Sequence, residues 1–315
     1  MVELADITLA RYRLTPYLAP TPLEAAIDLG ADVWLKLENA NKTHSFKVRG
    51  ALNALLAPPV AARARGVVTA SLGNHAQGIA YAAGLLGIEA RVLMPVYTAK
   101  RKVAGVRRYG AQAILYSDDY GEIEREARRI ERDEGLTYIS AYNHGDVIAG
   151  QGTIGLEIAD ALPGVERVIV PVGGGGLIAG IAIALKSLKP SVEVIGVNAA
   201  VSPDMYNFFY NANEPLSHES LADALPGEIE PGSITFELAR RYVDRIVRAS
   251  EAEIAEAMRW MVGQQGWLAE GGGLVGVAAL QSGAVAPGGV TVAVISGGNV
   301  DAETVARVLR TEGRE

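Results

Sequence analysis

Short runs of β-branched and other apolar residues alternate along most of the chain with longer stretches in which apolar residues recur every three or four positions. The first pattern is typical of buried strands and the second of helices. Their alternation predicts βαβ units, a mostly parallel sheet and therefore an α/β fold. The strands are expected at residues 66–69, 90–94, 113–116, 167–170, 193–197, 245–247 and 292–295.

The first three of these strands form a continuous block with helices expected near residues 75–86, 99–109 and 120–135. We predict two lobes: a small substrate-side domain of residues 55–141, and a discontinuous large cofactor-binding domain of residues 1–54 and 142–315. Ligands of open α/β sheets bind beyond the carboxyl ends of the strands, so the chemistry is expected in loops that face the cleft between the lobes. Residues 202–232 have weak periodicity and predict a long loop with a short helix.

Composition narrows the class of protein. The apolar fraction of 49% and charged fraction of 21% favour a compact globular chain, while the net charge of −7 argues against a nucleic-acid partner. A basic run at residues 100–102, with Arg107 and Arg108, has helical spacing and indicates a solvated face. The absence of cysteine excludes disulfides, thiolate nucleophiles and cysteine-ligated metals.

The sequence offers no targeting or membrane segment. Glu3 and Asp6 stand where a signal peptide needs a basic region. Residues 168–185 lack charge, but Pro171 and four glycines make them a poor membrane span. A cytoplasmic enzyme without a membrane partner is the expectation.

Four consecutive glycines, Gly173, Gly174, Gly175 and Gly176, follow a buried-looking strand and precede an apolar helix that begins near Leu177. Successive glycine amides can point into one concavity, and the helix N-terminus adds positive charge, so this loop suits a phosphate. Close packing of strand and helix is the alternative explanation. Residues 174–179 also match a dinucleotide fingerprint, but residues 196–200 read GVNAA and lack the acid that should bind a ribose.

Lysine is the side chain that forms Schiff bases, and Lys47 lies in the segment NKTHSFKVRGA, residues 41–51. A lysine close to an anion site suggests an aldehyde cofactor that bears a phosphate. A surface lysine is the alternative, although Phe46 and Val48 give it apolar neighbours.

Two further loops follow strands. Residues 70–78, ASLGNHAQG, precede a helix, and their amides could hold a carboxylate. Here His75 is either a general base or a structural hydrogen-bonding residue. Residues 295–300, ISGGNV, have a tight turn as their simplest explanation.

Taken together, Ser45-Phe46-Lys47, Gly73-Asn74-His75, the four glycines, Ser296-Gly297-Gly298-Asn299 and residues 147–153 closely resemble the fold type II pyridoxal-phosphate family. The resemblance spans nearly the whole chain and is strongest to threonine/serine dehydratases and serine racemases. It implies pyridoxal 5′-phosphate (PLP) as the cofactor and a two-lobed α/β fold with open, mostly parallel twisted sheets flanked by helices. It also implies a homodimer or homotetramer.

The resemblance assigns roles to individual residues. Lys47 is implied to be the Schiff-base lysine, Phe46 to pack against the pyridine ring, and Asn74 to bind the ring hydroxyl. The phosphate is implied to bind the main-chain amides of Gly173, Gly174, Gly175, Gly176 and Leu177. Ser296 is implied to face the pyridine nitrogen, and a neutral hydroxyl there favours rapid elimination over a long-lived carbanion.

The implied reaction is loss of water from a small β-hydroxy-amino acid, such as threonine, serine or hydroxyaspartate, to give a 2-oxo acid and ammonia. Lys47 would remove the Cα proton as general base. The substrate-binding residues are predicted to be Ser71, Leu72, Gly73, Asn74 and His75, through their amides, and Asn143 as a specificity contact.

Several departures from the family pattern matter. Leu72 replaces the serine of the racemases, so it argues against racemisation and crowds the site. Asn198 replaces a metal-binding Glu, which predicts no metal site, and Ala224 replaces a common glycine. An amino-acid racemase, a β-replacement synthase and a PLP-binding protein without turnover remain alternatives, with a nicotinamide dehydrogenase last.

Overall fold

Two separate sheets organise the protein. In the computed structural model, which describes residues 2–217, 219–286 and 288–310, a six-stranded sheet has the order β1-β2-β10-β7-β8-β9 and a four-stranded sheet the order β5-β4-β3-β6. Every neighbouring pair is parallel except β1 with β2. The predicted α/β class with mostly parallel sheets is confirmed.

All seven predicted strands are present. They are β3 (Val67–Ala70), β4 (Ala90–Met94), β5 (Gln112–Leu115), β7 (Arg167–Pro171), β8 (Glu193–Ala199), β9 (Arg245–Ala249) and β10 (Thr291–Ile295). Three strands that the sequence did not predict are β1 (Leu23–Ala25), β2 (Val33–Leu37) and β6 (Thr137–Tyr138).

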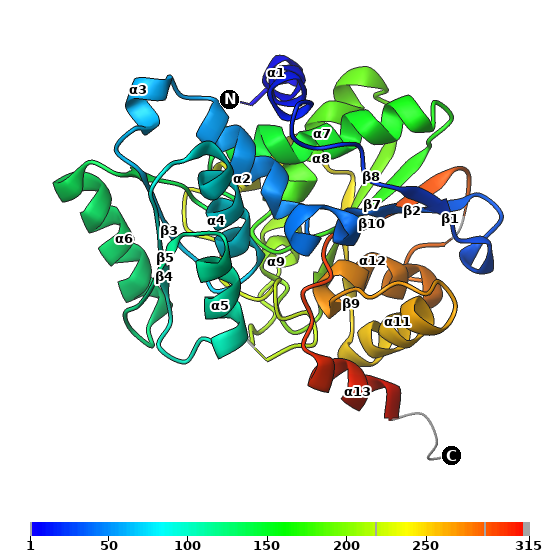
Figure 1. Ribbon diagram of the computed structural model, residues 1–315. Helices are drawn as coiled ribbons and strands as arrows, with labels where there is room; N and C mark the ends of the chain where they lie inside the picture. Colours follow the sequence, from blue (N-terminus) through cyan, green and yellow to red (C-terminus); the bar gives the residue numbers. More distant parts are fainter. Residues whose placement is uncertain (1, 218, 287, 311–315) are drawn as a thin grey trace.

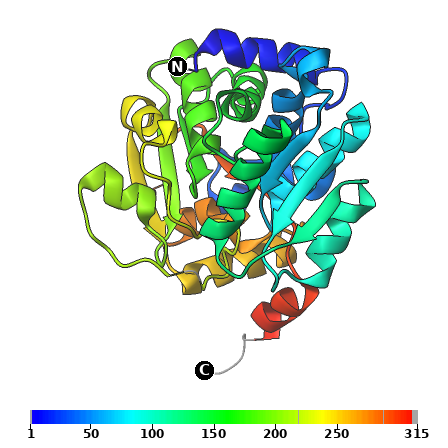
Figure 2. The same ribbon diagram turned by 90° about the vertical axis from the view of Figure 1, so that its left-hand side faces the viewer.

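The four-stranded sheet lies between helices on both faces (Figures 1 and 2). α6 (Tyr120–Glu134) covers one face, and α4 (Asn74–Leu86) and α5 (Lys100–Arg108) cover the other. These are the three predicted helices of the block. α2 (Lys47–Leu56) packs on α4 and on α7 (Gly145–Ala161), and α3 (Val60–Arg63) follows it.

The six-stranded sheet is also covered on both faces (Figure 1). On one side lie α7, α8 (Gly176–Leu188), the N-terminal α1 (Leu4–Leu14), α9 (Asp204–Tyr210) and α10 (Ile234–Tyr242). On the other lie α11 (Glu251–Gly263), α12 (Gly271–Gln281) and the C-terminal α13 (Ala302–Arg310). Short 3-10 turns are η1 (Ile27–Leu29), η2 (Glu38–Ala40) and η3 (Lys42–His44).

The strands of the small sheet come from residues 67–138, and those of the large sheet from residues 23–37 and 167–295. We propose that the two lobes divide at 54/55 and at 141/142. The first of these boundaries falls within α2, near its C-terminal end. In its described part, which leaves out residue 218, the segment 202–232 contains one short helix, α9, followed by loop, as predicted.

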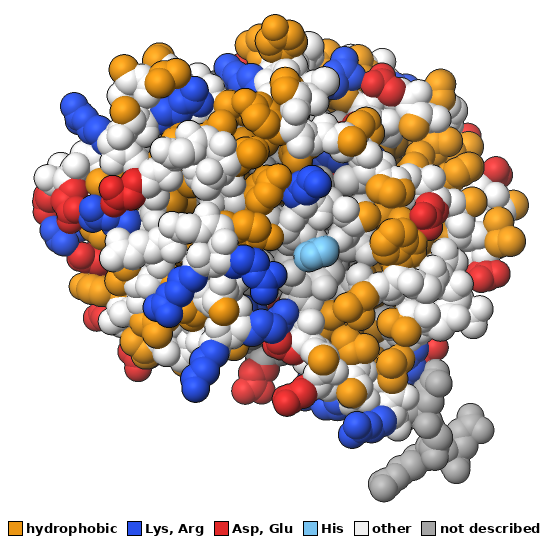
Figure 3. All heavy atoms as spheres, viewed as in Figure 1, with side chains coloured by type: hydrophobic (Ala, Val, Ile, Leu, Met, Phe, Trp, Pro, Cys, Tyr) orange, Lys and Arg blue, Asp and Glu red, His pale blue; other side chains and the backbone are white. Residues whose placement is uncertain are grey.

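The basic run on α5 is only partly a solvated face. Figure 3 shows basic side chains gathered over α5. Arg101 pairs with Asp301 at 2.6 Å and Lys102 pairs with Asp223 at 3.2 Å. These ion pairs join α5 to loops that connect with the large sheet, one before β9 and one after β10, so part of the run contacts the rest of the protein.

A buried ionic network fixes the start of α2. Arg49 is 2% exposed and Glu38 is fully buried, and their side chains lie 2.8 Å apart. Arg49 also binds Glu157 of α7, which in turn pairs with Lys36 of β2. Burial lowers the pKa of Arg49, but Glu38 and Glu157 outweigh it and raise that pKa overall. The network links α2, β2 and α7 through Arg49, which lies in the first turn of α2, close to Lys47.

Within the ranges described above, none of the helices is long and apolar enough to cross a membrane. The same ranges hold no cluster of three His, Cys, Asp or Glu side chains suited to a metal ion.

Candidate active site

Lys47 begins α2, immediately after an isolated bridge that pairs Ser45 with Gly297. Its Nζ donates a hydrogen bond to the carbonyl of Ala141 at 2.8 Å and lies 5.0 Å from the centre of the Phe46 ring. Phe46 donates its amide hydrogen to the carbonyl of Ser296 at 3.0 Å. The lysine, the phenylalanine and the loop after β10 are thereby brought together.

The glycine loop has free amides. It runs from the end of β7 to the first turn of α8, with Gly175 in the left-handed region at φ +84°. The amides of Gly173, Gly174 and Gly175 donate to no other group in the described part of the chain. Unpartnered amides at a helix N-terminus form an anion site.

The loop also requires small residues. A Cβ at Gly174 would overlap the ring of Tyr142, and one at Gly173 would lie 2.8 Å from the carbonyl oxygen of Leu225. A Cβ at Gly176 would lie 3.0 Å from Cα of Tyr142. Tyr142 directly follows Ala141, the acceptor of the Lys47 hydrogen bond. The segment Ala141–Tyr142 therefore connects the lysine with the anion loop.

A second set of free amides lies at the start of α4. The Ser71 amide is used by the carbonyl of Leu93, and the Gly73 amide by the Ser71 hydroxyl. The amides of Leu72, Asn74 and His75 have no acceptor within the described ranges. A Cβ at Gly73 would meet nothing within 4 Å, so the space in front of this turn is open. Three of the five predicted carboxylate-binding amides are thus available.

Asn74 is held by Glu270, which the sequence analysis did not identify, and by Asn299, to which it gave no role beyond a turn. Its Nδ2 donates to Glu270 Oε1 at 2.6 Å, and its Oδ1 accepts from Asn299 Nδ2 at 2.8 Å. The Asn299 amide also binds the carbonyl of Thr43, whose φ of +57° is unusual for a residue other than glycine. Glu270 and Asn299 therefore fix Asn74 relative to the segment that carries Lys47.

The surroundings of Lys47 lower the pKa of its amine, so it loses its proton more readily than a lysine in water. Burial lowers the pKa of Lys47 to about 8, and the Glu270 carboxylate opposes that shift. Burial and Asp223 raise the pKa of Glu270 to about 7, against the hydrogen bond from Asn74. A lysine with this pKa is partly unprotonated near neutral pH and can act as a base.

His75 is structural in this arrangement. It is buried, and its Nε2 lies 3.2 Å from the carbonyl of Ile139. Burial and the nearby Lys47 lower its pKa to about 3, so the ring stays neutral. The geometry agrees with the hydrogen-bonding alternative and gives His75 no role as general base.

Leu72, Asn143 and Ser296 are the remaining residues that the sequence analysis assigned to the substrate or the cofactor. Leu72 is partly buried and packs on the hydrophobic cluster of α2 and α4. The Asn143 side chain donates to Glu230 at 2.7 Å and accepts from the Ile234 amide at 3.1 Å, so it braces the loop before α10. Ser296 is buried at the end of β10. Their substrate and cofactor roles stay predictions.

Asn198, which stands where metal-activated relatives have a Glu, and the nearby Asp204 both brace loops. Asn198 donates to the carbonyl of Val172 at 2.9 Å and accepts from the Tyr206 amide at 3.0 Å. Asp204 accepts from the Ile229 amide.

Two mostly parallel sheets, a partly buried lysine and two sets of unpartnered amides together point to a class of protein. The chain belongs to the pyridoxal-phosphate dependent enzymes, whose family model matches residues 14–297. The predicted family, cofactor and fold type are confirmed.

Particular relatives narrow the class. The chain is 42% identical to L-threonine ammonia-lyase of Thermotoga maritima, over 98% of this chain and 78% of the relative. It is similar to the solved threonine deaminase isoform 2 of Solanum lycopersicum, with 32% identity, a TM-score of 0.90, and coverage of 98% of this chain and 87% of that one. Maize serine racemase is 29% identical with a TM-score of 0.90, over 98% of this chain and 97% of that chain. The prediction of a PLP-dependent lyase is confirmed by these similarities.

The residues present fit PLP. Free amides at Gly173–Gly175 suit its phosphate, Lys47 can bond its aldehyde, and the Asn74 amide is oriented by Glu270 and Asn299. The assignment of the glycine loop to the phosphate of PLP can be tested by a substitution at Gly174.

Gly174→Ala is expected to weaken PLP binding about 10- to 100-fold, because the new methyl group overlaps the Tyr142 ring and the loop must shift, which moves its free amides away from the phosphate. Titration of the apoenzyme with PLP, followed by absorbance, measures the affinity. Gly263→Ala is the matched control, since a Cβ there meets nothing within 4 Å. Equal affinities in the two variants would contradict the assignment of the loop.

Proposed function

We propose that the chain is a PLP-dependent ammonia-lyase that removes water from a small β-hydroxy-amino acid, releasing a 2-oxo acid and ammonia. One observation carries the proposal: the Lys47 amine, with its pKa lowered to about 8, is held on Ala141, whose neighbour Tyr142 packs on the unpartnered amides of the glycine loop. The Lys47 backbone also faces Gly78 of α4, the helix whose first turn carries the second set of unpartnered amides. One set suits a cofactor phosphate and the other a substrate carboxylate. Threonine, serine and hydroxyaspartate are the candidate substrates.

PLP, when bound, supplies an electron-accepting ring that makes the Cα proton of the attached amino acid acidic. In our proposal the amides of Leu72, Asn74 and His75 hold the substrate carboxylate, and the Lys47 amine takes the Cα proton. Ser296 would face the ring nitrogen and could donate a hydrogen bond to it, which would favour an unprotonated ring. Loss of the β-hydroxyl as water, followed by hydrolysis, balances to the 2-oxo acid and ammonia.

Leu72 supports elimination over racemisation. Inversion at Cα requires a proton donor on the face opposite Lys47, and a leucine side chain cannot exchange a proton. Leu72 also packs on the cluster of α2 and α4, so this apolar side chain is held in place.

A substrate panel tests the proposal. The holoenzyme is incubated with both enantiomers of threonine, serine and hydroxyaspartate, and 2-oxo acid and ammonia are measured together with the chirality of the remaining amino acid. Equal amounts of the two products from at least one substrate are expected. Inversion without ammonia would instead support a racemase, and absence of any change would support a PLP-binding protein without turnover.

The pH dependence of kcat gives a second prediction. Because Lys47 must be unprotonated to accept a proton, kcat should rise with pH and reach half of its maximum at about pH 8. Glu270 raises the pKa of Lys47, so Glu270→Gln should move this rise to lower pH by about one unit. The amide oxygen introduced by this substitution can still accept the Asn74 hydrogen bond.

Steady-state kcat between pH 6 and 10 measures the shift, a range of about two units on either side of the pKa. Glu303→Gln, an exposed residue of α13, is the control and should leave the profile unchanged. A rise at the same pH in Glu270→Gln would show that Lys47 and Glu270 are not coupled.

A further inference from the structure

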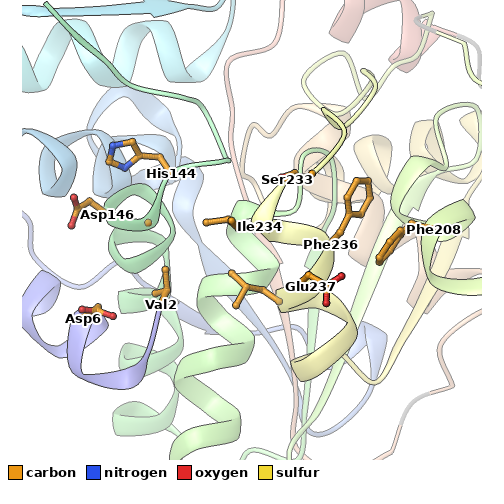
Figure 4. A pocket seen from close by; sticks show the side chains of 12 residues that line it. Val2, Asp6, His144, Asp146, Phe208, Ser233, Ile234, Phe236 and Glu237 are labelled. Carbon is orange, nitrogen blue, oxygen red and sulfur yellow. The ribbon is translucent and has the colours of Figure 1, made fainter.

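A cavity of about 750 Å³ lies between α1, the start of α7 and α10, and it is separate from the Lys47 site. Figure 4 shows Val2, Asp6, His144 and Asp146 on one side, with Ile234, Glu237 and two phenylalanines on the other. None of its lining residues belongs to the glycine loop, to the start of α4 or to α2. Its volume is that of a pocket for a small organic molecule.

The cavity is negatively charged. Asp6, Asp146 and Glu237 line it, and no lysine or arginine does. His144 adds no positive charge at neutral pH, because burial lowers its pKa. Asp146 and Glu237 form no ion pair within the described ranges, so their charges are available to a ligand.

The opposite wall is aromatic. The rings of Phe208 and Phe236 lie 4.1 Å apart, and the Arg240 guanidinium stands 4.6 Å from the centre of the Phe208 ring. This aromatic pair already accepts one cation. Carboxylates facing aromatic rings are the groups that proteins use to bind organic ammonium ions.

Apolar side chains complete the lining. Val2 and Leu238 are buried at its base, and Ile234 is 42% exposed beside it. An exposed isoleucine in a concave surface gains from covering by an apolar group. A ligand for this cavity therefore needs both a positive charge and an apolar body.

We propose that this cavity is a binding site for a small organic ammonium ion that carries an apolar or aromatic group. The proposal does not depend on the reaction at Lys47. The cavity is nevertheless linked to that site through the chain. His144, the N-cap residue of α7, comes three residues after Ala141, the acceptor from Lys47. Asn143, which accepts a hydrogen bond from the Ile234 amide, comes two residues after Ala141.

Benzyltrimethylammonium is a suitable probe, since its quaternary nitrogen carries charge and cannot react with PLP. Isothermal titration calorimetry on the holoenzyme measures its binding, with benzyl alcohol as the uncharged aromatic counterpart. We expect the cation to bind and Glu237→Gln to weaken it at least about fivefold, the factor that corresponds to about 1 kcal/mol. Benzyl alcohol should bind more weakly than the cation by a similar factor.

Two controls locate the binding. Glu303→Gln removes a carboxylate on α13, outside the cavity, and should leave the affinity unchanged. Lys47→Ala should also leave it unchanged, and a loss of binding in that variant would assign the probe to the PLP site and overturn the proposal.

Other outcomes would also overturn it. These are no measurable heat at about 1 mM probe, the weak end of small-ligand affinity, or equal binding of the cation and the alcohol. The proposal would also be overturned if the cation did not bind and Ile234→Glu converted an oligomer into monomers. That pair of results would assign the cavity to an interface between copies of the chain.

Discussion

Lys47→Ala is expected to lower turnover of the hydroxy-amino acid substrate at least about 10³-fold. Loss of a positioned general base alone costs about 10²- to 10⁴-fold, and this variant also loses the amine that bonds the cofactor. The amine is the one that lies 2.8 Å from the Ala141 carbonyl and has a pKa near 8. The coupled release of 2-oxo acid and ammonia measures the effect.

Lys42→Ala is the matched control, because Lys42 is an exposed lysine five positions earlier and should be dispensable. A small primary amine added to Lys47→Ala should restore part of the activity if the defect is the missing base, whereas a folding defect would not respond. Retention of a large part of wild-type turnover in Lys47→Ala would refute our assignment.

Arg49→Met is expected to lower the free energy of unfolding by about 3–5 kcal/mol, because it leaves the fully buried Glu38 carboxylate without its partner. The methionine fills a similar volume, so lost charge rather than a cavity dominates the cost. Urea denaturation followed by circular dichroism measures the change. Because α2 begins at Lys47, the variant should also lose activity.

Arg11→Met is the matched control. Arg11 pairs with Asp160 at 2.8 Å, but both side chains are largely exposed, so about 1 kcal/mol or less is expected. The double variant Glu38→Gln with Arg49→Met should recover part of the lost stability, since it removes the unpaired charge. No recovery would indicate that packing, and not charge, accounts for the loss.

The strands that could be predicted are those whose apolar pattern is uninterrupted. β2 was missed because its sequence VWLKL contains Lys36, a charged residue that is buried in the strand and neutralised by Glu157. No local pattern indicates such a pairing, since Glu157 comes 121 positions later. β1 and β6 are three and two residues long, too short to produce a period.

The site residues divide in the same way. Lys47, Asn74 and the glycine loop lie in compact motifs, so they could be proposed as site residues from the sequence. Glu270 precedes three glycines at the start of α12 and contacts Asn74 from 196 positions away, so only the fold brings them together. The glycine run at 271–273 was the one available signal.

The tight fit of the glycine loop limits how this protein can change over evolutionary time. Position 174 is restricted by the ring at position 142, and position 173 by the backbone at position 225. A lineage could therefore gain a side chain at 174 only after, or together with, replacement of Tyr142 by a residue without a ring. Position 173 has no such route, because the backbone of Leu225 cannot become smaller. Across many descendants of such a chain, positions 142 and 174 should vary as a pair, while position 173 should stay glycine.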